Sequence, residues 1–131
     1  MKVTLVTPDN SYFDGPAERA TLVAWDGEVG ILPGHAPLIN RLGHGIARIH
    51  DGTKEHRFAV FGGFLKVQDD LVTVLAGGAA TAEGDPAQAK QDDDAAQAAL
   101  GQAIAAGTTG SELADLEEKA RRARVLRSLL A

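Results

Sequence analysis

Residues 58–76 read FAVFGGFLKVQDDLVTVLA, a succession of short apolar runs interrupted by glycine or aspartate. Runs this short, rich in β-branched and aromatic residues and bounded by turn residues, are typical of β-strands. In KVTLV, residues 2–6, the alternation places Val3 and Leu5 on one face. Several short strands at this spacing predict a flattened antiparallel β-sandwich or barrel. Other such runs are ATLVAW at 20–25 and GIARI at 45–49.

Two details of this region predict local backbone geometry. Asp51-Gly52 lies between two strand-like runs and is typical of a hairpin turn, because left-handed positions suit Asp and Gly. His50 and His56 flank this turn, where they either face each other across the hairpin or lie at a solvated strand end. Gly62-Gly63, inside the FGGF run, indicates a β-bulge or a close approach of two backbones.

After Gly84 the composition changes from β-branched residues to Ala, Gln, Asp, Glu, Lys and Arg, which favour helices. Asp85-Pro86 is a typical helix start, with an N-cap followed by proline at the first helical position. This helix is expected to extend to about Ala106. We therefore divide the chain into a β-sandwich domain, 1–84, and a helical hairpin domain, 85–131.

A second helix follows the GTTG break at 107–110, with Thr109 or Ser111 as its N-cap. Because the connection is short and glycine-rich, the two helices should lie antiparallel. The second helix has a single apolar stripe at spacings of three or four residues. Its members are Leu113, Leu116, Ala120, Ala123, Leu126 and Leu130.

Opposite charges occupy the two ends that an antiparallel hairpin brings together. Asp92, Asp93 and Asp94 lie early in the first helix, while basic residues crowd the end of the second. Acids early and bases late also suit each helix dipole. The first helix is so rich in alanine that it buries little, so we expect a loosely attached hairpin. The basic residues are Lys119, Arg121, Arg122, Arg124 and Arg127.

Composition and motifs exclude several classes of function. The net charge of −5 argues against a general nucleic-acid partner, and no cysteine is present for a disulfide or thiolate site. No apolar run approaches the roughly 20 residues that span a bilayer, so we expect no direct membrane insertion. The histidines form no metal motif and no phosphate-binding P-loop occurs. We therefore expect no catalytic residue, metal or cofactor.

The segment GEVGILPGHAP, residues 27–37, allows two interpretations. It can be a strand and a tight turn, in which glycines take positive φ and prolines fix the path. It can also be a rigid loop that presents Ile31, Leu32 and one histidine, His35, to a partner. The basic end of the second helix is similarly either a solvated face or a surface for an acidic partner.

Three segments together resemble the ε subunit of F-type ATP synthases, whose mitochondrial counterpart is called δ. They are TLVTP near the N-terminus, DGEVGILPGHAPLINRLGHG at 26–45 and FAVFGGFLKVQDDLVTVLA at 58–76, followed by two helices. The resemblance implies a flattened sandwich of about ten strands carrying a C-terminal helical hairpin. It also implies a non-catalytic central-stalk subunit that binds γ and the polar loops of the c-ring. The ring-facing residues would be Glu28, Gly30, Ile31, Leu32, Pro33, Gly34, His35, Ala36 and Pro37.

The resemblance further implies a regulatory role for the helices. They would extend along γ towards the α and β subunits and restrain ATP hydrolysis, with the five basic residues facing an acidic loop of β. Some bacterial members bind ATP through an Ile/Leu-Asp-x-x-Arg-Ala pattern. Here the matching residues include Asp85, Gln88 and Ala89, but the apolar residue and the arginine are missing. We therefore expect no tight nucleotide binding.

The resemblance places the chain on the cytoplasmic side of the bacterial inner membrane, as a peripheral subunit, or on the stromal side of the thylakoid. The start at Met1, without a transit segment, favours a bacterial or organelle-encoded chain. The competing interpretations are a small β-sandwich enzyme, a sugar-binding module and an adaptor unrelated to ATP synthases. An enzyme would need a metal or acid pair, and a sugar site would need exposed aromatic rings beyond Trp25 and Tyr12.

Overall fold

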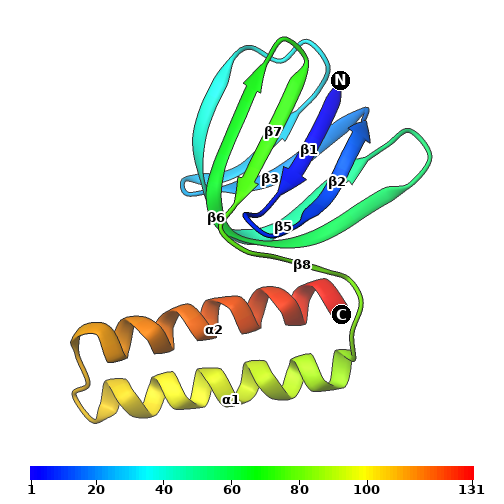
Figure 1. Ribbon diagram of the computed structural model, residues 1–131. Helices are drawn as coiled ribbons and strands as arrows, with labels where there is room; N and C mark the ends of the chain where they lie inside the picture. The colour runs from blue at the N-terminus through cyan, green and yellow to red at the C-terminus, as the bar shows by residue number, and fades with distance from the viewer. The chain divides into compact units, whose positions relative to one another are not determined.

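The computed structural model describes residues 1–131, which form eight β-strands followed by two α-helices (Figure 1). The chain forms two compact units, Met1–Ala82 with the strands and Glu83–Ala131 with the helices. The strands are β1 (Lys2–Val6), β2 (Ser11–Pro16), β3 (Arg19–Ala24), β4 (Gly27–Ile31), β5 (Leu38–His50), β6 (Glu55–Gln68), β7 (Leu71–Ala76) and β8 (Ala79–Thr81). The helices are α1 (Pro86–Ala105) and α2 (Gly110–Leu130).

The strands pair in the order β2-β1-β7-β6-β5-β3-β4, with β8 added on β6, and curve into the predicted sandwich (Figure 1). The long strand β6 changes neighbour partway along. Its first half pairs with β8 at Phe58–Val60, and its second half pairs with β7 at Gly63–Gln68. Because β5 and β6 run unbroken for 13 and 14 residues, the structure has eight strands where about ten were expected.

One strand pair departs from the antiparallel arrangement that the sequence predicts. β1 runs parallel to β7, with Val3 beside Val72 and Leu5 beside Val74. On its other side β1 pairs antiparallel with β2. The N-terminal strand is therefore enclosed within the sheet rather than placed at its edge.

The core follows the alternation of apolar residues in these strands. Val3 and Leu5, which the sequence places on one face, are fully buried, and so are Leu65, Val72 and Val74. Burying one such side chain stabilises the fold by about 1.5–3 kcal/mol. Because aromatic residues are few, the core consists mainly of valine, leucine, isoleucine and alanine.

Two turns connect the long strands in different ways. The β5–β6 hairpin lies where Asp51-Gly52 predicts it, but only Gly52 has positive φ. Asp51 instead accepts hydrogen bonds from the backbone N–H groups of Thr53 (2.8 Å) and Lys54 (2.7 Å) through one carboxylate oxygen. The left-handed pair is Asp69-Asp70 between β6 and β7, with φ of 52° and 58°. Two such residues define a type I′ hairpin turn.

Gly62-Gly63 marks a close approach of two backbones, one of the two alternatives considered. Both glycines have positive φ. A Cβ atom at Gly63 would overlap the carbonyl oxygen of Leu75 and lie 2.8 Å from Ala76 Cα. The neighbouring strand therefore passes directly over this glycine, at the point where β6 exchanges β8 for β7 as its partner.

The helical unit begins as the sequence predicts. Asp85 caps α1 by accepting a hydrogen bond from Ala87 N–H (3.0 Å), and Pro86 is the first helical residue. Thr109 occupies the N-cap position of α2 without a side-chain hydrogen bond. Of α1, only Ala89, Asp93 and Ala96 are buried, in keeping with its alanine-rich composition. Neither helix has the length and apolar character needed to cross a membrane.

Candidate functional site

The segment Glu28–Pro37 forms the end of β4 and the loop that follows it. Glu28, Gly30 and Ile31 lie on β4, whereas residues 32–37 connect β4 to β5. At the tip, His35 N–H donates to the carbonyl of Leu32 (3.1 Å), and Gly34 has φ of 81°. Proline followed by a left-handed glycine is the signature of a type II turn. The glycine and the proline therefore shape a tight turn.

Asp70, from the turn between β6 and β7, holds this loop in place. The backbone N–H of Gly34 donates to Asp70 Oδ1 at 2.7 Å. The carbonyl of the same aspartate accepts from Lys2 N–H at 2.9 Å. Asp70 thus ties the loop to the start of β1 and has a structural role.

Replacing Asp70 tests whether this contact positions the loop. Asp70→Ala should lower the free energy of unfolding by about 1–2 kcal/mol, because it removes a charged acceptor and puts alanine in a left-handed position. Asp70→Asn keeps an acceptor oxygen and tolerates that position, so it should lose much less. Urea unfolding and amide hydrogen exchange at Gly34 measure both effects. Equal losses in the two variants would contradict this account.

The side chains of the segment divide between core and surface. Ile31 is only 1% exposed and belongs to the core, so the expectation that it presents an apolar edge is wrong. Leu32 is 61% exposed and projects from the turn. His35 is half-buried, with Nδ1 2.7 Å from the carbonyl of Ala36. Glu28 is exposed and forms a 3.5 Å ion pair with Arg48 on β5. The remaining exposed members are Gly30, Pro33, Gly34, Ala36 and Pro37.

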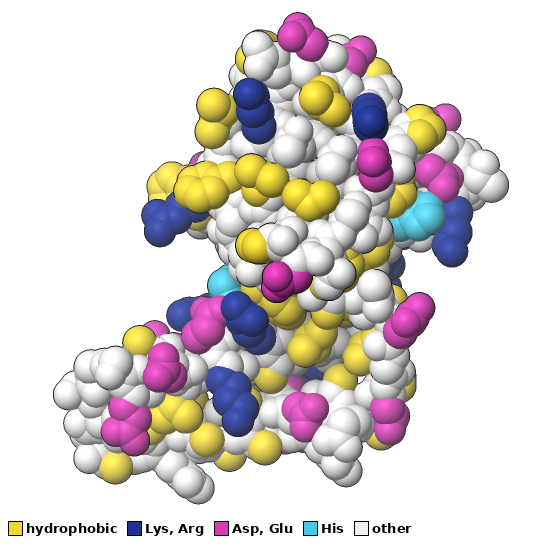
Figure 2. Space-filling model, in the orientation of Figure 1, with side chains coloured by type: hydrophobic (Ala, Val, Ile, Leu, Met, Phe, Trp, Pro, Cys, Tyr) yellow, Lys and Arg dark blue, Asp and Glu magenta, His cyan; other side chains and the backbone are white.

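A second surface, not found from the sequence, lies on the outward face of β5, β6 and β7. Ile39, Phe64 and Leu75 are 75%, 59% and 53% exposed. Phe64 pairs directly with Leu75, and Leu75 pairs with Val6 of β1, so these side chains share one face of the sheet. Figure 2 shows hydrophobic side chains in a row across the sandwich. We call Ile39, Phe64 and Leu75 the apolar strip.

Basic residues border the apolar strip. Arg41 on β5 lies opposite Phe64, and Lys66 on β6 lies opposite Ile39. An apolar centre with a polar rim is the composition of a protein–protein interface. The sequence does contain a sign of this surface, because Leu71 and Leu75 are large apolar residues at positions of β7 that point away from the core. The run LVTVLA is apolar on both faces, however, so its pattern does not reveal that the outer face is exposed.

The four arginines of α2 already have partners within the helical unit. Arg121 forms ion pairs with Glu117 (3.8 Å) and Glu118 (3.7 Å), and Arg122 Nε lies 2.8 Å from Glu118 Oε1. Arg127 reaches across to α1, as predicted from the antiparallel charges, and binds Asp93 (2.9 Å) and Asp94 (3.3 Å). Arg124 lies 3.9 Å from Asp93, and Lys119 lines the groove between the helices.

The residues of the degenerate nucleotide motif have structural roles. Asp85 caps α1, and Gln88 donates to Asp92 Oδ1 across one helical turn (2.8 Å). Ala89 is buried in the groove between α1 and α2. These contacts are compatible with the absence of tight nucleotide binding, which stays a prediction.

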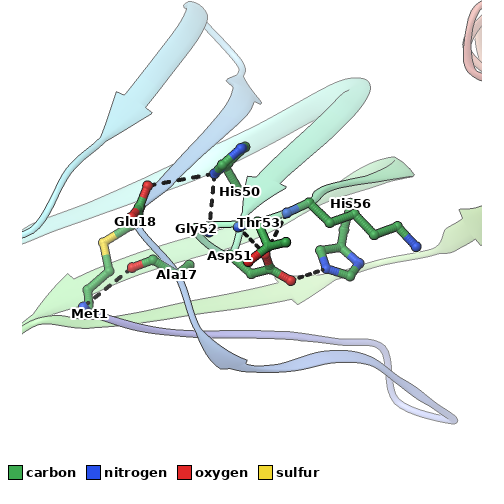
Figure 3. A network of polar contacts seen from close by, with 9 residues as sticks. Met1, Ala17, Glu18, His50, Asp51, Gly52, Thr53 and His56 are labelled. Atoms are coloured by element: carbon green, nitrogen blue, oxygen red, sulfur yellow. Dashed lines mark hydrogen bonds and ion pairs between the residues drawn. The ribbon is translucent and has the colours of Figure 1, made fainter.

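His50 and His56 do not face each other across the hairpin. His50 pairs with Glu55 and His56 with Ile49, so the two rings lie on opposite faces (Figure 3). His50 Nδ1 accepts from Gly52 N–H (3.2 Å) and lies 3.8 Å from Glu18. His56 Nε2 contacts Asp51 Oδ2 at 2.8 Å. Each histidine therefore supports one side of the turn.

The contact with His56 makes the turn sensitive to acid. Hydrogen bonds from His56, and then from the backbone N–H groups of Lys54 and Thr53, outweigh burial and hold the pKa of Asp51 well below its usual value. A carboxyl group with a lowered pKa in the folded state stabilises the fold fully above about pH 4. That contribution is lost as the pH falls through the folded-state pKa.

We expect the wild-type chain to be more stable than Asp51→Asn at pH 6, and this difference to shrink as the pH falls from about 4 to 2. Asparagine keeps an acceptor for the turn but has no charge to lose. Urea unfolding midpoints of the two proteins across this pH range measure the effect. A difference that stays constant with pH would contradict the assignment.

No group of three or more His, Cys, Asp or Glu side chains in the structure could hold a metal ion. The surfaces that the structure does provide are an exposed apolar strip on a rigid sheet, a turn fixed by Asp70 and a helix with five basic residues. A β-sandwich and a helical hairpin with such surfaces define a two-part protein built to contact other proteins.

Comparison with known proteins shows to which family this protein belongs. The family model described as "ATP synthase, Delta/Epsilon chain, beta-sandwich domain" matches residues 1–82. An ATP synthase epsilon chain of Synechococcus sp. strain JA-2-3B'a(2-13) is 39% identical over 86% of this chain and 77% of its own length. That of Cyanothece sp. is 36% identical over 95% of this chain and 92% of its own. The chain belongs to the ATP synthase delta/epsilon chain family.

Solved structures share the fold. A chain in the mitochondrial ATP synthase of Euglena gracilis superposes with a TM-score of 0.79 at 22% identity, covering 98% of this chain and 80% of that chain. A chain from the central stalk and c-ring of the Tetrahymena thermophila enzyme gives a TM-score of 0.54 at 22% identity. It covers 63% of this chain and 66% of that one. Membership of the family excludes an adaptor or sugar-binding module unrelated to ATP synthases.

Proposed function

We propose that the chain is a central-stalk subunit that couples rotation to ATP synthesis without catalysing a reaction itself. The apolar strip is the observation that carries this proposal. A protein domain rarely leaves a row of large apolar side chains on a rigid sheet unless another protein covers it. In a member of this family, that partner is the γ subunit.

The two surfaces of the sandwich suit two different partners. Phe64 and its apolar neighbours, bordered by Arg41 and Lys66, suit an apolar surface of γ with acidic residues at its rim. The turn at Leu32–His35 is narrow, and its exposed polar neighbours include Glu28. Such a turn suits the polar loops of the c-ring, which we propose as its partner.

The helical unit supplies the regulatory part of the proposal. The four arginines of α2 lie within 4 Å of carboxylates in this chain, which supports a role for their guanidinium groups in carboxylate contacts. In the assembled enzyme we propose that the helices extend towards the α and β subunits. The basic residues then bind an acidic loop of the β subunits and restrain ATP hydrolysis. The chain would then be a peripheral subunit on the cytoplasmic side of the bacterial membrane, or the stromal side of the thylakoid.

The test is ATP hydrolysis by the matching α, β and γ subunits with three versions of this chain added back. The versions are the full chain, a truncation ending at Gly84, and the full chain with all five basic residues changed to alanine. We expect all three to bind γ and only the unmodified full chain to slow hydrolysis. Inhibition by the five-alanine chain, with its helices still folded by circular dichroism, would contradict the role of the basic residues. Failure of every version to bind γ would contradict the stalk assignment.

A further inference from the structure

The helices are joined by a buried polar cluster centred on Asp93. This side chain belongs to α1 and is only 2% exposed, which is unusual for a carboxylate. Its Oδ2 accepts from Arg127 Nη1 at 2.9 Å, and its Oδ1 accepts from Gln97 Nε2 at 3.0 Å. Gln97 also donates to the carbonyl of Ala120 on α2, at 3.0 Å. We call Asp93, Gln97 and Arg127 the clasp.

While the hairpin is closed, the charged and polar groups of the clasp satisfy one another. Burial alone would raise the pKa of Asp93, but hydrogen bonds from Arg127 and Gln97 and the charges of Arg124 and Arg127 outweigh it and lower that pKa. The hydrogen bond to Asp93 likewise raises the pKa of Arg127. No buried side-chain oxygen or nitrogen lacks a partner. Separating the helices would break all of these contacts together.

The other pairs formed by the basic residues are different in kind. Arg121 and Arg122 bind Glu117 and Glu118, which lie on the same helix three or four residues away. Those pairs move with α2 and do not resist its separation from α1. Only Arg124 and Arg127 contact acids of α1. The four arginines of α2 therefore divide into two that pair within α2 and two that close the hairpin.

We propose that Asp93 is an internal competitor for the carboxylates that Arg124 and Arg127 bind in a partner. This inference rests on the proposed inhibitory function of the basic residues. In the closed hairpin both arginines are held by Asp93, with Asp94 as a second contact for Arg127. Before they bind an acidic partner, they must exchange one carboxylate for another.

The two arginines lose a carboxylate of α1 and gain a carboxylate of the partner, so the net free-energy change of this exchange is small. A modest difference in affinity between the two carboxylates is then enough to shift the balance from closed to open hairpins. The balance between closed and open hairpins is then set by the acidic partner itself. No small ligand is needed to hold the hairpin closed, since the carboxylate that holds it is part of the chain.

The variant Asp93→Asn tests the clasp, with Asp92→Asn as its matched control. Both remove one negative charge from α1 and keep the side-chain shape. Asp92, however, contacts Gln88 of its own helix and no arginine. In the isolated full chain, Asp93→Asn should speed amide hydrogen exchange in α1 and α2 by roughly tenfold, and Asp92→Asn should leave it unchanged.

A double-mutant cycle with Arg127→Gln shows whether the two side chains act together. If the clasp is the cause, adding Arg127→Gln to Asp93→Asn should change the exchange rate much less than Arg127→Gln does alone. Additive effects would mean that Asp93→Asn loosens the helices by another route, and would overturn the clasp.

The competition itself is tested by measuring how strongly each variant inhibits ATP hydrolysis by the α, β and γ subunits. Asp93→Asn should inhibit at a roughly tenfold lower concentration than the wild-type chain, because its arginines are held less tightly within the hairpin. Faster amide hydrogen exchange in Asp93→Asn without stronger inhibition of ATP hydrolysis would overturn the proposed competition. The conclusion that the clasp holds the two helices together would still stand. If neither the wild-type chain nor any variant inhibits, the proposed inhibitory function is wrong and the competition falls with it. The exchange experiment still decides whether the clasp holds the hairpin closed.

Discussion

Gly63→Ala is expected to lower the free energy of unfolding of the sandwich by roughly 2–4 kcal/mol, a large share of the stability of a small domain. Two costs combine. Alanine is strained at the φ of 117° that Gly63 adopts. Its Cβ would also overlap the carbonyl oxygen of Leu75, which belongs to the backbone and cannot rotate away.

The matched control for this substitution is Gly15→Ala on β2. Gly15 has ordinary φ, and a Cβ there would meet no atom within 4 Å. Its stability should change by no more than about 0.5 kcal/mol. Urea unfolding of both variants, followed by tryptophan fluorescence of Trp25 or by circular dichroism, measures the difference. If the two glycines were equally tolerant, the close approach of β6 and β7 would not be a constraint on this fold.

Phe64→Asp is expected to weaken binding to γ by roughly a hundredfold while leaving the sandwich folded. Aromatic side chains at the centre of an interface commonly contribute 2–4 kcal/mol or more to binding. A carboxylate in the same place would also have to give up its bound water once γ covers it. Because Phe64 is 59% exposed, the free chain loses little stability. Titration of a γ-containing complex with the purified variant gives the dissociation constant.

Trp25→Asp serves as the comparison for Phe64→Asp. Trp25 is also aromatic and is 68% exposed, but it lies at the turn between β3 and β4 and outside the apolar strip. We expect its affinity for γ to be unchanged. A similar loss in both variants would show that the effect comes from adding a charge to the sandwich and not from the apolar strip.

Much of the fold follows from local patterns in the sequence. Alternation in KVTLV places Val3 and Leu5 on one face, which is the buried face, and Asp85-Pro86 correctly predicts the start of α1. The parallel pairing of β1 with β7 was missed. Alternation identifies which residues share a face, but it does not say which distant strand lies alongside. Pairing of strands some 70 residues apart depends on the whole sheet.

The surfaces were harder to predict than the fold. One of the two interpretations of residues 27–37 has Ile31 exposed beside Leu32, yet Ile31 is the last residue of β4 and is buried in the core. Phe64 and Leu75 were missed for the opposite reason, since their strands are apolar on both faces. The antiparallel charges of the helices did indicate that Asp93 and Arg127 meet. Their burial depends on how closely the two backbones pack, which alanine content alone does not specify.

The enclosure of β1 between β2 and β7 has a consequence for the order in which this protein forms during synthesis. Residues 2–6 leave the ribosome before the other strands of the sandwich, but one of their two neighbouring strands is completed only at residue 76. Pairing so distant in sequence is intrinsically slow, and until it occurs the edge of β1 that β7 covers stays unpaired. The sandwich therefore closes only after β7 has been made.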